Sequence, residues 1–345
     1  MKNTLQKFKV LLLVTVLMTV LAACSDKEGA EGAEGEVIKI RMANQVDEGN
    51  FLNQGYVKFK EVLEEKGKGQ FAVEIYNGGT LVGSDDGIVE ALKSGSIEIS
   101  TSSAYGTANT TGVNGFKLFD MPLLIDNRES FYNLLDGEFG EGLKEEVAKN
   151  NNLKVLGFID LGFYSILNGK KDVSTPADLK GLKIRSSAAD LHLDSLAAMG
   201  ANPTPLSYTE VFTGLQQGAI DGVSTTTPLI YGDRFFEINK HLTLTNHVLL
   251  PHVLMINGDL YERLTDEQKS ILEEATAEYI KYARELSIEA EKEAVEGMKA
   301  EGVTVTELTE DQKEEFKKVV APVIDKHINE IGKDVYDKAI EELNK

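Results

Sequence analysis

Short apolar stretches alternate with longer amphipathic segments along most of this chain. The segments 51–65 and 87–92 carry apolar residues at helical spacing and predict α-helices. Helices between short strands imply crossover connections and a mostly parallel sheet. The number of strands is too large for one sheet with short connections, so the pattern favours an α/β protein with two lobes. The short stretches predict β-strands, at 37–43, 71–76, 97–101, 154–159, 163–167, 182–185, 219–224 and 252–257.

Two capping boxes open the helices of the C-terminal quarter. The segments 265–268 and 309–312 both begin with Thr and end with Gln, with two acids between them. The first helix runs without Gly or Pro to 296, about 32 residues or about 48 Å. A coiled coil is the alternative, but sustained apolar heptads are missing after Leu286. We expect this helix to lie across both lobes, with a hinge between them.

The first 23 residues have the pattern of a signal peptide. Lysines precede an apolar run over 10–23 that is too short to span a bilayer comfortably. The run ends Leu21-Ala22-Ala23-Cys24, which resembles the lipobox of bacterial lipoproteins, and Cys24 is the single cysteine of the chain. An ordinary secretory signal with a chance cysteine is the alternative. We expect lipidation at Cys24 and a location on the extracytoplasmic face of the cell membrane.

An acidic, Gly-rich stretch over 24–36 has no apolar periodicity and predicts an extended tether.

The overall charge and the cysteine count exclude several classes of function. The formal charge of −20 argues against nucleic acid as a partner. A single cysteine excludes a disulfide framework and a multi-thiolate zinc site.

A search for catalytic and metal-binding motifs finds none. The chain lacks a G-x-S-x-G elbow, a Walker loop, a dinucleotide fingerprint and an H-E-x-x-H pair. The five histidines show no ligand pair at helical spacing, so core or surface roles are expected for them. Asp85, Asp86 and Asp120 are expected to be helix caps or to lie in solvated turns, with a role as general bases as the alternative. The chain is therefore expected to have no cofactor, no metal site and no enzymatic activity.

Arginine is the informative residue type, because only six of the 36 basic residues are Arg. Five of them lie among acids or at polar helix ends, where solvated ion pairs are expected. Arg185 closes the short strand predicted at 182–185 and precedes a helix start. The carboxyl end of a parallel strand is where α/β proteins bind ligands. A guanidinium there matches a carboxylate with two parallel hydrogen bonds, although a structural ion pair remains an alternative.

Three linked segments resemble the solute-binding proteins of TRAP transporters, of the DctP type. Shorter matches are 79–83 (GTLVG) and 121–124 (MPLL), and the similarity extends from residue 37 to the end. The three segments occur in the family's order and read 178–185 (DLKGLKIR), 200–212 (GANPTPLSYTEVF) and 215–222 (LQQGAIDG).

The resemblance implies a periplasmic-binding-protein-like fold that encloses a small organic anion between two lobes. Lobe I is expected over 37–160 plus about 248–290, and lobe II over 161–247 plus about 291–345. Hinge closure captures the ligand and presents it to the membrane permease subunits of an ion-driven transporter. We expect a monomer. A sensory binding protein that presents its ligand to a receptor, and a surface enzyme, are the alternatives.

The resemblance also implies site residues. Arg185 matches the arginine that pairs with the ligand carboxylate, and Tyr208 the position where an aromatic side chain packs on the ligand. Thr225 corresponds to a polar contact, and Ser103 and Asn44 fall near others.

Two departures from the family pattern affect the expected ligand. Tyr164 stands where many relatives have a second arginine, and Ser224 where they often have Glu. One arginine among hydroxyl groups suits one carboxylate with hydroxyl or carbonyl groups better than a C4-dicarboxylate.

Overall fold

The computed structural model describes residues 37–344. The predicted signal peptide, Cys24 and the tether lie outside the described residues. In chain order the strands are β1 (Ile38–Ala43), β2 (Phe71–Tyr76), β3 (Ile99–Ser103), β4 (Leu153–Asn168), β5 (Lys183–Ser186), β6 (Asn202–Pro205), β7 (Gly222–Thr226), β8 (His241–Leu244), β9 (Leu249–Asn257) and β10 (Thr304–Glu307).

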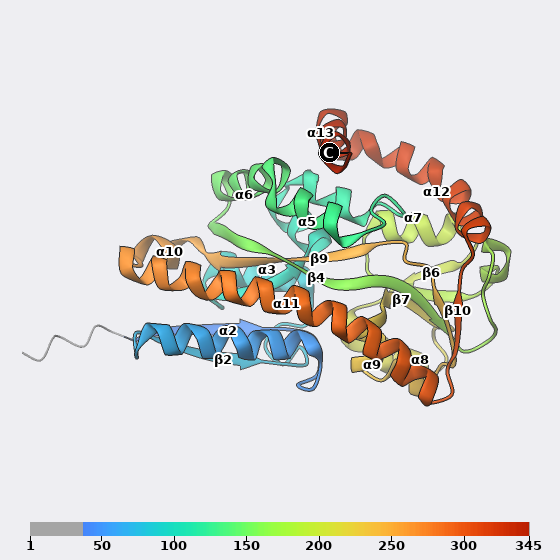
Figure 1. Cartoon of the computed structure of the whole chain (residues 1–345), viewed down its shortest axis with the longest axis horizontal. Helices are drawn as coiled ribbons and strands as arrows, with labels where there is room; N and C mark the ends of the chain where they lie inside the picture. The colour runs from blue at the N-terminus through green and yellow to red at the C-terminus, as the bar shows by residue number, and fades with distance from the viewer. Residues whose placement is uncertain (1–36, 345) are drawn as a thin grey trace, which may run out of the picture. The chain divides into compact units, whose positions relative to one another are not determined.

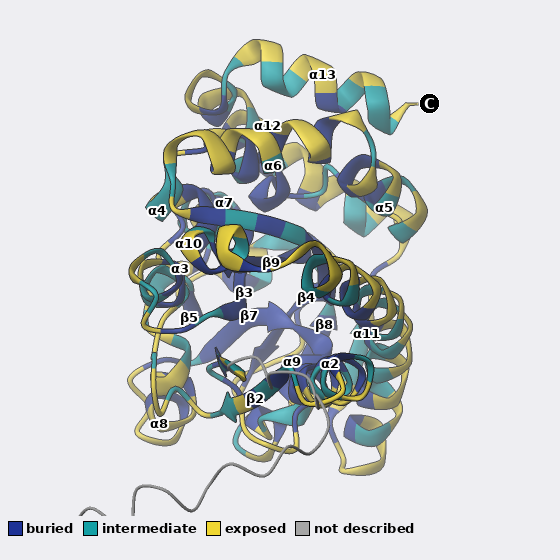
Figure 2. Ribbon diagram, turned by 90° about the vertical axis from the view of Figure 1, so that its left-hand side faces the viewer, coloured by how far each residue is buried: buried dark blue, intermediate teal, exposed yellow. Residues whose placement is uncertain are grey.

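Helices surround these strands (Figure 1). The α-helices are α2 (Phe51–Gly67), α3 (Asp85–Ser94), α4 (Ala104–Thr111), α5 (Arg128–Asp136), α6 (Glu138–Asn150), α7 (Asp190–Ala198), α8 (Val211–Gln216), α9 (Thr227–Gly232), α10 (Gly258–Arg263), α11 (Asp266–Ala300), α12 (Glu310–Ile331) and α13 (Lys333–Leu343). Short 3-10 helices are η1 (Asn114–Asp120), η2 (Pro176–Leu179), η3 (Tyr208–Glu210) and η4 (Phe235–Glu237). The strands β3, β7 and β9 are buried along their whole length, whereas β6 and β10 are partly exposed and the helices expose their outer faces (Figure 2).

The strands form two groups that share β4. In the first group β1 pairs with β2 and lies beside β3, and β3 pairs with β9, which pairs with the first part of β4. The second group has the order β10-β8-β4-β7-β5-β6. We refer to each strand group, together with the helices packed on it, as a lobe: the first group forms the first lobe and the second group the second lobe.

The sequence predicted two strands over 154–167, and the structure has a single strand there. β4 runs from the first lobe into the second, changing partners from β9 to β7 and β8. A register shift between Asp160 and Phe163 marks the change of partners. Gly162 has φ +94° at this point, a conformation that L side chains rarely adopt. The positions 160–162, which separated the two predicted strands, therefore form a bulge within one crossing strand.

The expectation of a mostly parallel sheet is wrong. Among the described pairings four are parallel and four antiparallel. All four antiparallel pairings involve β4 or β9. The chain enters the second lobe along β4 and returns to the first through the segment between β8 and β9, so β9 runs opposite to β4.

The long helix α11 lies across both lobes, as predicted. Its 35 residues extend about 52 Å, and the capping box at Thr265 is present. Tyr279 packs edge-on against Phe59, with ring centroids 5.6 Å apart, in the apolar core beneath α2. Near the end of the helix, Ala294 and Met298 belong to a different core that contains Leu242 of β8.

The last helices also contact both lobes. Phe316 at the start of α12 packs in a core of the second lobe, together with Ile184 of β5. Further along, Ile331 of α12 and Ala339 of α13 join the core of the first lobe around Phe116. The second capping box, at Thr309, opens α12 as predicted.

Candidate functional site

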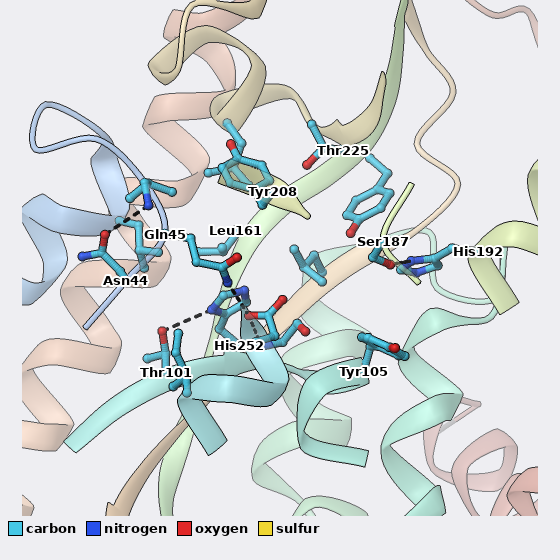
Figure 3. Close-up of a pocket in the computed structure, with 18 of the residues that line it drawn as sticks. Asn44, Gln45, Thr101, Tyr105, Leu161, Ser187, His192, Tyr208, Thr225 and His252 are labelled. Atoms are coloured by element: carbon cyan, nitrogen blue, oxygen red, sulfur yellow. Dashed lines mark hydrogen bonds between the residues drawn. The ribbon is translucent and has the colours of Figure 1, made fainter. Parts of the chain in front are cut away.

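A cavity lies between the two lobes. Side chains from both strand groups line it (Figure 3). The structure brings together all six residues that the sequence placed in the ligand site. They are Asn44 after β1, Ser103 at the end of β3, Tyr164 in β4, Arg185 in β5, Tyr208 in η3 and Thr225 in β7.

Arg185 is the central cation of this cavity. It lies in β5, where the strand alternation directs Ile184 into an apolar core and Arg185 toward the cavity. The residue is 5% exposed, and its Nε donates to the Leu206 carbonyl at 2.9 Å. Burial lowers the pKa of the guanidinium from its ordinary value.

Arg185 has no carboxylate within ion-pair distance over residues 37–344. Four other arginines form ion pairs, as expected for them: Arg41 with Glu98, Arg128 with Asp160 and Glu291, Arg234 with Glu237, and Arg284 with Asp136. A buried charge is costly unless it is paired. The cavity is therefore suited to an anionic group that completes the coordination of Arg185.

Tyr208 forms one wall of the cavity beside this cation. The Arg185 Cζ lies 5.6 Å from the centroid of the Tyr208 ring, within cation–π range. The Tyr208 hydroxyl donates to a carboxylate oxygen of Asp233. Burial, followed by the Asp233 charge, raises the pKa of Tyr208 well above its ordinary value, so the hydroxyl remains a donor.

Asp233 links this wall to the first lobe. Its Oδ1 accepts from Nδ2 of Asn50, at the start of α2, at 3.0 Å. Burial raises the pKa of Asp233 to about 6, although the hydrogen bonds from Tyr208 and Asn50 oppose the shift. Protonation of one carboxyl group thus affects a contact between the lobes.

We predict a pH-dependent stability difference between the wild type and Asp233→Asn. Because the folded-state pKa is raised, the carboxyl group stabilises the fold most below pH 4, and this contribution is lost as pH rises through about 6. The free energy of unfolding of the wild type relative to the variant should fall by about 2–3 kcal/mol across this window. Chemical denaturation from pH 4 to 8 measures it, and a constant difference contradicts the assigned pKa.

The other predicted site residues differ in how many of their side-chain hydrogen bonds are already made within the protein. Thr225 and Tyr164 donate no side-chain hydrogen bond among the described residues, and both residues line the cavity. Ser103 Oγ caps α4 by accepting from Gly106 N at 3.2 Å, which leaves its proton available. Asn44 is more occupied, since its amide donates to Asn77 and its oxygen accepts from Val46 N.

The sequence analysis missed two acids and two histidines of the cavity wall: Asp85, Asp120, His192 and His252. Asp85 does lie in the first turn of α3, as a capping position would, but it also faces the cavity. His252 lies opposite Ser103 in the antiparallel β3–β9 pair. This register joins segments about 150 residues apart, so no local sequence signal identifies it.

Over residues 37–344 no cluster of His, Cys, Asp or Glu has an arrangement that could hold a metal ion. None of the helices in that range combines the length and apolar character needed to cross a membrane.

A profile of the bacterial extracellular solute-binding proteins, family 7 (DctP), matches residues 42–331. The chain belongs to this family. It is a TRAP-type solute-binding protein with the two-lobed fold of periplasmic binding proteins, as the sequence motifs predicted. Members of the family are extracellular solute-binding proteins. They serve transport and are not enzymes.

Three relatives illustrate the similarity of this family 7 protein to known proteins. The 2,3-diketo-L-gulonate-binding periplasmic protein of Escherichia coli is 32% identical over 248 residues, 72% of this chain and 74% of the relative. The C4-dicarboxylate-binding periplasmic protein of Rhodobacter capsulatus is 29% identical and covers 87% of this chain and 89% of its own. A TRAP solute-binding protein of Roseobacter denitrificans, solved with β-D-glucuronate, is 28% identical with a TM-score of 0.81, covering 88% and 98%.

Proposed function

We propose that this protein captures a small organic acid by pairing its carboxylate with Arg185 in the cavity between the lobes. The observation that carries the proposal is a guanidinium that is 95% buried without a carboxylate partner over residues 37–344. A ligand carboxylate supplies the missing partner, and the Tyr208 ring covers it.

The ligand class follows from the cavity wall. The relatives described above bind a diketo sugar acid, a C4-dicarboxylate and glucuronate. This cavity has one arginine, with hydroxyl groups from Tyr164, Thr225 and Ser103 nearby. One guanidinium neutralises one carboxylate, so a hydroxylated monocarboxylate is the favoured class and a C4-dicarboxylate is the second candidate.

Capture proceeds by hinge closure of the two lobes around the ligand. The chain crosses between them along β4, along the segment between β8 and β9, and along α11. The lobe boundaries proposed from the sequence, 37–160 with about 248–290 and 161–247 with about 291–345, are kept except for α13 and the second half of α12, which pack with the first lobe. The closed form then docks on the permease subunits of a TRAP transporter, and this role is favoured over presentation to a sensory receptor.

Ligand-dependent melting across a panel of organic acids tests the proposal. A ligand that binds only the folded protein stabilises it in proportion to the logarithm of its concentration over Kd. We expect at least one carboxylate to raise the melting temperature of the wild type, and the neutral alcohol or amide analogue to have no effect. Equal stabilisation by the neutral analogue excludes carboxylate recognition.

We further propose that Cys24 carries a lipid that retains the mature protein at the membrane. The lipobox and the acidic tether of 24–36 support this anchor. In Cys24→Ala the apolar run of 10–23 remains, while acylation is prevented. We expect the wild type in the membrane fraction and most of the variant in the soluble extracytoplasmic fraction. Equal membrane retention of both proteins, with a cleaved N-terminus, contradicts lipid anchoring.

A further inference from the structure

A second ionisable group in the cavity wall has an incomplete set of hydrogen bonds. Asp120, at the end of η1, is 1% exposed, and its Oδ1 has no hydrogen-bond partner over residues 37–344. Nε2 of His192 lies 3.1 Å from this oxygen, yet the two atoms are not aligned for a hydrogen bond, and Nε2 is also unsatisfied. Buried polar atoms are almost always hydrogen-bonded, so two adjacent exceptions in a cavity wall indicate a missing partner.

The His192 ring is held in place from its other side. Nδ1 lies 2.8 Å from Oγ of Ser187, and the ring packs 5.2 Å from the ring of Tyr164, between centroids. In Figure 3, Ser187 and His192 lie together on one side of the cavity, opposite Asn44 and Gln45. The free nitrogen is therefore presented at a fixed position beside Asp120.

Tyr164 is influenced by the charges of both Asp120 and Arg185. Burial raises the pKa of Tyr164, the Asp120 charge raises it further, and the Arg185 charge lowers it. A cation and an anion thus line one cavity, with Tyr164 near both of them. A ligand that satisfies both must carry a carboxylate at one end and a hydrogen-bond donor at the other.

A second carboxylate has no favourable place in this arrangement. At the Asp120 end it faces a like charge, and Asp85 adds another carboxylate to the wall, held by Gln45 at 3.1 Å. His252 does not compensate at neutral pH, because burial lowers its pKa. Placing like charges together is an effective means of rejecting a competing ligand.

We propose that Asp120 and His192 form a hydroxyl-recognition subsite that selects hydroxylated monocarboxylates and rejects dicarboxylates. Asp120 accepts a hydrogen bond from a ligand hydroxyl group, and Nε2 of His192 pairs with the same or an adjacent hydroxyl. The inference rests on the proposed function, in which Arg185 binds the ligand carboxylate.

The test compares hydroxylated monocarboxylates of three to six carbons with succinate and malate, by calorimetry. We expect the wild type to bind its best monocarboxylate at least ten-fold more tightly than either dicarboxylate. Asp120→Asn should weaken that monocarboxylate roughly 10- to 100-fold, with succinate unchanged or tighter, and His192→Gln should act in the same direction. Circular dichroism verifies that each variant is folded.

Asp172→Asn is the matched control, because Asp172 also lies beside a histidine, with 2.7 Å between Oδ1 and Nδ1 of His241, but outside the cavity. It should leave all affinities unchanged. If the wild type prefers dicarboxylates, or Asp120→Asn weakens both classes equally, the subsite is wrong while carboxylate recognition at Arg185 stands. A preference for α-amino acids over hydroxy acids also overturns it, since Asp120 then pairs with an ammonium group. Failure of every carboxylate to bind overturns the proposed function itself.

Discussion

Arg185→Ala is expected to lower ligand affinity by about 2–5 kcal/mol, roughly 30- to several-thousand-fold. The loss is large because the variant leaves a ligand carboxylate buried without its counter-charge. Arg185→Lys should recover only part of the affinity, since an ammonium group cannot make two parallel hydrogen bonds to a carboxylate. Calorimetry with the acid that gives the largest melting shift measures both variants.

Unliganded stability distinguishes a binding role from a structural one. Arg185 has no carboxylate partner over residues 37–344, so Arg185→Met should leave the free energy of unfolding of the unliganded protein equal or higher. Arg234→Ala is the control, because Arg234 pairs with Glu237 at the exposed surface. Wild-type affinity in Arg185→Ala, or a severe loss of unliganded stability in Arg185→Met, contradicts the anchor.

Asp160→Ala is expected to reduce the free energy of unfolding by about 3–5 kcal/mol. Asp160 is completely buried at the bulge of β4 and accepts from the Tyr132 hydroxyl at 2.5 Å and the Ser287 hydroxyl at 2.7 Å. It also accepts from Gly162 N at 2.9 Å and pairs with Arg128. Truncation leaves several buried donors and one half-buried cation without their acceptor. Chemical denaturation at neutral pH measures the loss.

Two variants control for this effect. Asp160→Asn retains one acceptor oxygen and the shape of the side chain, so its loss should be smaller. Asp136→Ala removes a carboxylate that also pairs with an arginine, Arg284, at 2.6 Å, but Asp136 is half-exposed. Exposed pairs contribute about 0–1 kcal/mol, so this variant should be nearly neutral. If Asp160→Ala is no more destabilising than Asp136→Ala, the buried network at the bulge does not stabilise the fold.

Local sequence patterns predicted the secondary structure correctly where the stabilising contacts lie between residues close in sequence. The capping boxes at Thr265 and Thr309 gave the starts of α11 and α12, because a cap is a contact within four residues. The short strands β6, β8 and β10 were missed, since each has only four residues and pairs with distant segments. The prediction of mostly parallel strands was wrong for the same reason, because strand direction depends on how the chain crosses between the lobes.

In the ligand site, too, the residues with a local sequence signal were predicted and those that depend on tertiary contacts were not. Arg185 could be singled out because it lies at the end of a short predicted strand, and the family resemblance gave the remaining five residues, which the structure brings to one cavity. Asp120 and His192 were assigned to a turn and to ordinary core or surface roles, since neither has a chemical partner nearby in sequence. Their meeting depends on η1 and α7 lying side by side, which is a tertiary contact.

The long helix α11 inserts side chains into two separate apolar cores. Detaching its last third from the second lobe would expose Ala294 and Met298, and its first part cannot separate from the first lobe without exposing Tyr279. Neither half can therefore be cut out of the gene as an autonomous folding unit, because each would lack one side of its own interior. Movement of one lobe relative to the other therefore requires bending of α11 and twisting of the strand β4 that crosses beside it.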